Sequence, residues 1–252
     1  MNKSIDFNCD LGEYCSPGQE EKEKTILRYI SSANIACGMH AGNDESIYKT
    51  MLHAKSLGVS VGAHPSFPDR QNFGRTEMFL PSKELESVVY EQLQNFLNIA
   101  SSAGVEVCHV KPHGALYNMA AKSDGISKAI CVAIKKTNRD LKFFGLAGSV
   151  MLQVAKEQGF ETVSEVFADR RYGAGGFLVA RSKKNALITE VDEARTQLHR
   201  LVAEDRVLLE DKSFWGLSAQ TVCIHGDGVN AVEFAEGLRR EMDKLGVAVC
   251  PP

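Results

Sequence analysis

Short apolar runs alternate with amphipathic stretches along this chain, and the two spacings predict strands and helices in turn. Apolar runs of about four to eight residues between turn signals are typical of buried strands, whereas apolar positions three or four residues apart indicate helices. By this criterion, strands are predicted at residues 4–9, 33–36, 59–63, 105–110, 143–146, 162–167 and 221–224. Helices are predicted at residues 20–31, 44–56, 81–103, 125–136, 149–158, 192–204 and 231–244.

Two segments interrupt this alternation. Residues 64–80 form a loop that is too long for a simple connection, so we expect it to help form a site. Residues 171–184 contain Gly173, Gly175 and Gly176 and match neither a strand nor a helix. The rest of the chain keeps a regular order of strands and helices.

That regular order predicts an α/β fold in which parallel strands form a barrel. Because seven main strands are predicted, an incomplete or distorted barrel is favoured over a closed eight-fold one. A chain of 252 residues with 44% hydrophobic content can bury a full core. We therefore expect residues 1–252 to form one seven-stranded β/α-barrel domain.

Charge and composition restrict the kind of partner. A formal net charge of -3 leaves no basic field for nucleic acid or an anionic membrane, so the expected ligand is a small molecule. No window approaches the roughly 18 apolar residues that span a bilayer, and the N-terminus lacks an apolar signal segment. The seven cysteines show no C-x-x-C spacing. These features predict a cytoplasmic protein with reduced thiols.

Polar side chains gather where the predicted strands end. In a β/α architecture the C-terminal strand ends share one face, so groups far apart in sequence can converge there. This density of acid, base and metal-competent groups indicates an enzyme. The candidate catalytic residues are Asp10, Glu13, His40, His64, Lys111 and His113, and the candidate substrate-binding residues are Lys111, Asp169, Arg170, His225 and Asp227.

Asp10, His64 and His113 are candidate metal ligands, because each comes at or just after a strand. One carboxylate and two imidazoles can bind a divalent ion and leave positions open for water or substrate. These groups could instead act as acids and bases in a metal-free pocket. The structural alternatives are a loop cap for Asp10 and hydrogen bonds that order a proline-containing loop for the two histidines.

Two further residues extend this cluster. Glu13 follows Gly12 and could act as a general base or orient a histidine. A backbone bend at Gly38 could direct His40 inward. Each of the two could equally have a structural role.

Lys111 stands two residues before His113, so both side chains fall on one strand face if the strand continues that far. A lysine inside a barrel is costly unless it meets an anion, so Lys111 is expected to grip a carboxylate or phosphoryl group. The alternative is a salt bridge to Glu165 or Asp169.

The last candidates follow two later strands. Arg170 suits bidentate recognition of a carboxylate, although Asp169 and Arg170 could form a structural ion pair. His225 and Asp227 flank Gly226, and an imidazole–carboxylate pair there could orient a base or simply order the loop.

Several strings resemble the LamB/YcsF family. They are NCDLGE (8–13), NIACGMHAG (34–42), GAHPSFPD (62–69), NFGR (72–75), VKPHGALYN (110–118), EVFADR (165–170) and CIHGD (223–227). The resemblance runs from residue 6 to about residue 249, in family order. The chain departs from the usual family residues at Tyr14, Met39 and Asn72. These departures are expected to change the pocket rim more than the reaction.

The resemblance implies a seven-stranded β/α barrel of the glycoside hydrolase/deacetylase type. It also implies a part in converting 5-oxo-L-proline, ATP and water to L-glutamate, ADP and phosphate, together with B and C partner subunits. Asp10, His64 and His113 are similar to the Asp-His-His arrangement of deacetylases with this barrel. A divalent metal ion of unknown identity is therefore a candidate cofactor.

ATP is expected as a co-substrate, yet the chain has no G-x-x-x-x-G-K-[ST] motif. The run from Gly173 to Gly176 follows no strand-to-helix signal and is a weak phosphate cradle. ATP handling is therefore expected wholly or partly on the partners. The alternatives are a stand-alone metal-dependent amide or carbohydrate deacetylase and a noncatalytic binding subunit.

Overall fold

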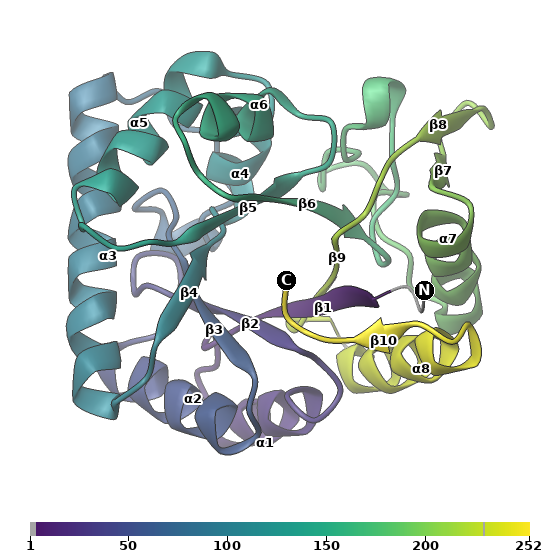
Figure 1. Ribbon diagram of the computed structural model, residues 1–252, viewed down its shortest axis with the longest axis horizontal. Coiled ribbons are helices and arrows are strands. Elements are labelled where there is room, and N and C mark those ends of the chain that lie inside the picture. The colour runs from purple at the N-terminus through teal and green to yellow at the C-terminus, as the bar shows by residue number, and fades with distance from the viewer. Residues whose placement is uncertain (1–3, 229) are drawn as a thin grey trace.

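Seven parallel strands close into a barrel in the structure, which is a computed structural model that describes residues 4–228 and 230–252 (Figure 1). The strands follow one another around the ring in chain order, and the last of them pairs with both the sixth and the first. They are β1 (Ser4–Leu11), β2 (Ser32–Ala36), β3 (Ser60–His64), β4 (Val107–Val110), β5 (Lys142–Leu146), β6 (Thr162–Phe167) and β9 (Thr221–His225).

Helices surround this ring on the outside, as Figure 1 shows. Neighbouring helices pack against one another, as α3 does with α5 and α7 does with α8. The helices are α1 (Pro17–Ile26), α2 (Asp44–Ser56), α3 (Ser82–Ala103), α4 (Gly114–Ala120), α5 (Asp124–Lys135), α6 (Val150–Glu157), α7 (Val191–Ala203) and α8 (Ala231–Lys244).

The predicted seven-stranded α/β barrel is confirmed, but the ring is closed rather than incomplete. Five residue pairs join β1 to β9, from Asp6↔Thr221 to Asp10↔His225. A distortion lies between β3 and β4, where the register shifts at Val61/Gly62. A Cβ atom on Gly62 would collide with the ring of His109, so this strand position needs glycine to let the ring pass.

Most element boundaries lie within a few residues of the prediction. The helix predicted at 20–31 begins and ends earlier, at Pro17–Ile26, because Ser16 caps it by accepting a hydrogen bond from the Gln19 N–H. Proline at the first helical position supports this start. The helix predicted at 81–103 ends as expected before Gly104, which has a left-handed φ of 61°.

Several short elements were missed because each lies in a segment without a long periodic pattern. Among them, α4 begins directly after His113, and β7 and β8 form an antiparallel hairpin outside the barrel. The missed strands and 3-10 turns are β7 (Arg206–Leu208), β8 (Phe214–Gly216), β10 (Ala248–Val249), η1 (Arg70–Asn72) and η2 (Ala174–Gly176).

Alternation along β1 separates the hydrophobic core from the barrel interior. Phe7 and Cys9 are fully buried in the hydrophobic core. Asp6, Asn8 and Asp10 alternate with them, so they project from the opposite face of the strand. They contact polar groups of other strands instead, and the barrel interior is therefore polar.

Within the described residues, no helix combines the length and apolarity that crossing a membrane would require. All seven cysteines are free thiols, as expected.

Candidate active site

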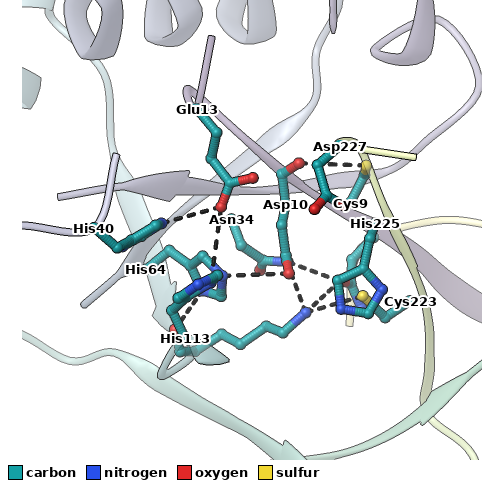
Figure 2. A network of polar contacts seen from close by, with 12 residues as sticks. Cys9, Asp10, Glu13, Asn34, His40, His64, His113, Cys223, His225 and Asp227 are labelled. Atoms are coloured by element: carbon teal, nitrogen blue, oxygen red, sulfur yellow. Dashed lines mark hydrogen bonds and ion pairs between the residues drawn. The ribbon is translucent and has the colours of Figure 1, made fainter. Parts of the chain in front are cut away.

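The strand-end residues predicted from the sequence meet at one end of the barrel (Figure 2). They come from β1, from β3 and from the segments that follow β1, β2 and β4. In Figure 2 the side chains of Glu13, His40, His64 and His113 point toward one another, with Asp10 beside them. The end of β9 contributes His225 on the other side of Asp10.

Glu13, His40, His64 and His113 form the tightest cluster, which we call the histidine cluster. One ligand-capable atom of each residue lies within 4.8 Å of those of the others. His40 Nε2 lies 3.0 Å from Glu13 Oε1, and His113 Nδ1 lies 2.9 Å from His64 Nε2. The rings of His40 and His113 stack, with centroids 3.8 Å apart. This set could hold a metal ion.

Backbone carbonyls determine which nitrogen of two rings carries the proton. His64 Nδ1 lies 2.7 Å from the carbonyl oxygen of Lys111, and His113 Nε2 lies 2.9 Å from that of Phe73. Because a carbonyl only accepts, each of these nitrogens must be the N–H donor. His64 Nε2 then faces two acceptors, the lone pair of His113 Nδ1 and Asp10 Oδ2 at 3.3 Å, which requires either a proton on His64 Nε2 or a cation between these atoms.

The set of candidate metal ligands differs from the one expected. Asp10 Oδ2 lies 3.3 Å from His64 Nε2, but Asp10 is not part of the histidine cluster, where Glu13 and His40 join His64 and His113 instead. Glu13 and His40 were expected to extend the cluster, but spacing could not show which side chains surround one point, because both lie in loops whose direction depends on the folded backbone.

Burial sets the charge of the cluster. It raises the pKa of Glu13 well above its usual range, with the nearby Asp10 carboxylate adding to the effect. Burial also lowers the pKa values of His40 and His113 well below their ordinary value. Neutral imidazoles are the form that binds metal ions or accepts protons.

The pKa of Asp10 shifts in the opposite direction to that of Glu13. Burial alone would raise its pKa, but His64 and Lys111 hold it well below the usual range. Lys111 Nζ lies 2.8 Å from Asp10 Oδ1 and 2.9 Å from Glu165 Oε1, and Lys111 is only 2% exposed. Of the two alternatives for Lys111, the salt bridge to Glu165 is the one that forms.

The side-chain amide of Asn34, on β2, orients Asp10. His109 Nε2 lies 2.8 Å from Asn34 Oδ1, and Asn34 Nδ2 donates to Asp10 Oδ1 at 2.8 Å. Burial lowers the pKa of His109 to about 3, so the ring is neutral and its Nε2–H donates to Asn34. Neither Asn34 nor His109 was predicted as a site residue, although His109 stands two positions before Lys111 and alternation could have placed it on the same face.

Glu23 is a further residue that was missed. It lies on α1, and its carboxylate accepts hydrogen bonds from the backbone N–H groups of Gly12 at 2.7 Å and Glu13 at 3.1 Å. Burial raises the pKa of Glu23 to about 7. Glu23 thereby fixes the turn that carries the Glu13 side chain, and no motif in a charged helix could have indicated this.

The pairing at the end of β9 differs from the expected one. His225 Nδ1 lies 2.9 Å from Asp169 Oδ2, so the carboxylate partner of this imidazole is Asp169 rather than Asp227. Asp227 pairs instead with Arg75. Asp169 is thus engaged with His225 and not with Arg170, whose Nη2 donates to the carbonyl of Val179 at 2.7 Å.

A cavity of about 940 Å³ opens beside these groups. Asp10, His64, His113 and His225 line it, as do residues of the long loop, including Arg75 and Phe79. The expectation that this loop contributes to the site is therefore confirmed.

The glycine run does not belong to the cavity lining. A Cβ atom on Gly176 would lie 2.8 Å from the indole of Trp215, so this glycine allows close packing against β8. The structure thus gives Gly176 a packing role.

Residues 5–252 match the model of the LamB/YcsF family. A protein from Histophilus somni, named as the A subunit of 5-oxoprolinase, is 45% identical over 247 residues, which cover 98% of each chain. The crystal structure of a lactam utilization protein from Thermus thermophilus has a TM-score of 0.88 at 36% identity, covering 98% of this chain and 99% of that one.

A family 4 carbohydrate esterase from Streptomyces lividans shares the fold at 12% identity, with a TM-score of 0.50 over 98% of this chain and 92% of that chain. This likeness concerns the barrel alone and confirms the expected deacetylase type of fold.

Proposed function

The chain belongs to the LamB/YcsF family, and on this basis we propose that it is the lactam-opening subunit of an ATP-dependent 5-oxoprolinase. The reaction class is hydrolysis of a cyclic amide. The observation that carries the assignment is the histidine cluster beside Asp10 and His225 at the wall of one cavity. Relatives named as 5-oxoprolinase subunits and a lactam utilization protein support the choice of substrate.

The facing lone pairs of His64 and His113 make the cluster suitable for a divalent cation, with Glu13 and His40 completing the ligand set. Such a cation, when bound, supplies Lewis acidity toward the ring carbonyl. Asp10 stays ionised beside it because Lys111 neutralises its second oxygen. The chain's own contribution is to hold these groups fixed in a buried site.

His225 is the proton carrier in this proposal. Asp169 accepts a hydrogen bond from Nδ1–H and so leaves Nε2 available on a ring that lines the cavity. Nε2 takes a proton from the attacking water and returns it to the ring nitrogen as the carbon–nitrogen bond breaks. Arg170 provides a guanidinium for an anionic group of the substrate.

We assign ATP handling to the B and C partner subunits. The word "subunit" in the name of the relatives indicates an assembly of several chains. The absence of a nucleotide-phosphate motif in the sequence supports a division of labour in which this chain performs the hydrolytic half.

The purified chain should therefore release no glutamate from 5-oxo-L-proline, with or without ATP. Adding the B and C subunits with ATP should produce glutamate and phosphate, measured together in a coupled assay. Rapid glutamate and ADP formation by the single chain would contradict the division of labour. Amide hydrolysis without ATP would instead favour the metal-dependent deacetylase.

A second prediction concerns the cation. Glu13→Gln removes one anionic oxygen from the ligand set and should weaken Mn²⁺ or Zn²⁺ binding by about 10-fold to 100-fold in isothermal titration calorimetry. Chelation should abolish glutamate formation, and one added equivalent of metal should restore it. Glu45→Gln on α2 is the matched control, because Glu45 is exposed and pairs with Lys49 on the surface.

Full activity after chelation, together with no measurable binding, would rule out the metal. The histidine cluster would then serve as acid and base groups in a metal-free pocket.

A further inference from the structure

The hairpin of β7 and β8 has one side that no strand covers. It lies outside the barrel ring, next to α7 (Figure 1). Its sheet contains only these two strands, so no other strand within residues 4–228 and 230–252 pairs with the far side of β8. We call this far side of residues 214–216 the open edge. A strand edge with free backbone groups is a place where another chain can pair.

Hydrogen bonds within the hairpin show which backbone groups face the open edge. The carbonyl of Ser213 and the N–H of Leu217 both bond to the opposite arm of the hairpin, at 2.9 Å each. Trp215 lies midway between them and faces the same way. Since alternate residues of a strand direct their N–H and C=O groups to opposite sides, those of Phe214 and Gly216 point away from β7. Nothing in the described part of the chain bonds to these outward groups.

The open edge lacks the features that usually prevent pairing between chains. Exposed edges are commonly protected by a lysine, a proline or a bulge, but this one has the sequence Phe-Trp-Gly. Phe214 and Trp215 are 48% and 44% exposed. Arg206 and Arg200 lie over the Phe214 ring, 4.1 Å and 5.9 Å from its centre, and help to hold it in place. The edge therefore offers two positioned aromatic rings and carries no charged side chain of its own.

The open edge is complementary to a second copy of itself. In an antiparallel pair centred on Trp215, Phe214 of one copy lies opposite Gly216 of the other, and their outward N–H and C=O groups face each other. Symmetry produces this pair twice, which gives about four backbone hydrogen bonds. Trp215 then faces Trp215 of the second copy at a position without hydrogen bonds, where opposite side chains approach most closely.

Gly216 is explained by this pairing and not by the single chain. A Cβ atom there would meet nothing closer than the Asp205 carbonyl at 4.0 Å, and Gly216 is not among the glycines with a positive φ. Glycine weakens a strand, so its presence without a packing or backbone reason calls for another partner. Opposite Gly216, the Phe214 ring of the second copy covers the bare backbone.

We propose that β8 is a dimerisation edge through which two copies of this chain pair antiparallel about a two-fold axis. The same edge of both copies is used, so the assembly closes at two. The resulting four-stranded sheet cannot grow, because α7 packs against β7 and Tyr172 pairs with Leu209 beside it. Three residues form a small interface, so the dimer dissociates on dilution. The proposal does not depend on the reaction proposed above.

Trp215 is the single tryptophan of the chain, so its fluorescence reports directly on the open edge. Sedimentation equilibrium of the full chain between about 1 μM and 500 μM should show monomers converting to dimers. The emission maximum of Trp215 should move to shorter wavelength over the same concentrations, because the second copy covers the indole. A chain that stays monomeric at every concentration would overturn the proposal, even if the B and C subunits cover Trp215 instead.

Phe214→Lys puts a charge on the open edge and should weaken the dimer at least about 10-fold while keeping the Trp215 reporter. Phe79→Lys is the matched control, because Phe79 is 85% exposed but belongs to the long loop of residues 64–80. It should leave the dimer unchanged. If both substitutions weaken the dimer equally, or neither does, pairing through β8 is wrong.

Gly216→Pro tests the backbone bonds, because proline removes an outward N–H that has no partner in the single copy. It should weaken the dimer at least about 10-fold, whereas Gly216→Ala keeps the N–H and should change the affinity by less than about 3-fold. Near-ultraviolet circular dichroism of Trp215 checks that the hairpin still forms, and Phe214→Lys decides the matter if proline disrupts it. Equal losses for alanine and proline in folded hairpins would refute the strand pairing.

Discussion

Replacing His64 with alanine should lower glutamate formation by the complete assembly on the order of 10³-fold. His64 contributes one of the two facing lone pairs, lies 2.9 Å from His113 Nδ1, and contacts Asp10 at 3.3 Å. Its loss removes a ligand from the histidine cluster and leaves His113 without its partner. Steady-state assays of glutamate release with saturating ATP measure the effect.

His53→Ala is the control for this substitution, because His53 lies on α2 outside the cavity lining. It should keep near-normal turnover. Circular dichroism of the His64 variant checks that the barrel still forms. Near-normal turnover of a folded His64→Ala protein would remove the histidine cluster from the mechanism.

Lys111→Met should lower the free energy of unfolding by about 3–5 kcal/mol, as measured in urea titrations. The ammonium lies between Asp10 and Glu165, which are 4% and 0% exposed. Methionine keeps the length of the side chain but leaves two buried carboxylates facing each other without a cation.

Lys111→Met combined with Glu165→Gln should recover part of the loss, because Asp10 is then the one carboxylate of the two that has lost its ammonium partner. Lys49→Met breaks an exposed pair with Glu45 and should change stability by less than about 1 kcal/mol. Equal losses for Lys111→Met and Lys49→Met would contradict the assigned role of the buried network.

These contacts revise the sequence-based interpretation of Lys111. A lysine in a barrel interior was expected to grip a substrate anion, and the anions it meets are instead carboxylates of the chain itself. The physical argument about burial was sound, since an unpaired ammonium would be too costly. The sequence could not show which anion Lys111 pairs with, because Glu165 lies on a strand that is distant in sequence and approaches Lys111 only across the barrel interior.

The fold was predictable because its signals are local. Apolar runs, amphipathic spacing and a glycine such as Gly104 act within a few residues, so the strand and helix order followed from them. Convergence of Asp10, His64 and His113 followed from one rule about parallel strands, whose C-terminal ends share a face.

Pairings across the site were less predictable, because they depend on side-chain directions in three dimensions. His225 was expected beside Asp227, two positions away, but the backbone after β9 turns Asp227 toward Arg75 and leaves His225 to Asp169. Glu23 supports the Glu13 turn from a helix that reads as an ordinary charged surface element.

The seam between β1 and β9 also dictates when the site can come into being. Residues 6–10 leave the ribosome long before their partners at 221–225 are synthesised. Such a long separation makes closure late and entropically costly. Until that closure, His225 is not yet beside Asp10, and Cys223 does not yet make its 3.0 Å contact with the Lys111 ammonium. The charged interior therefore remains exposed to water. A nascent chain can therefore build most of the outer helices early, but it cannot acquire a working pocket before β9 is made.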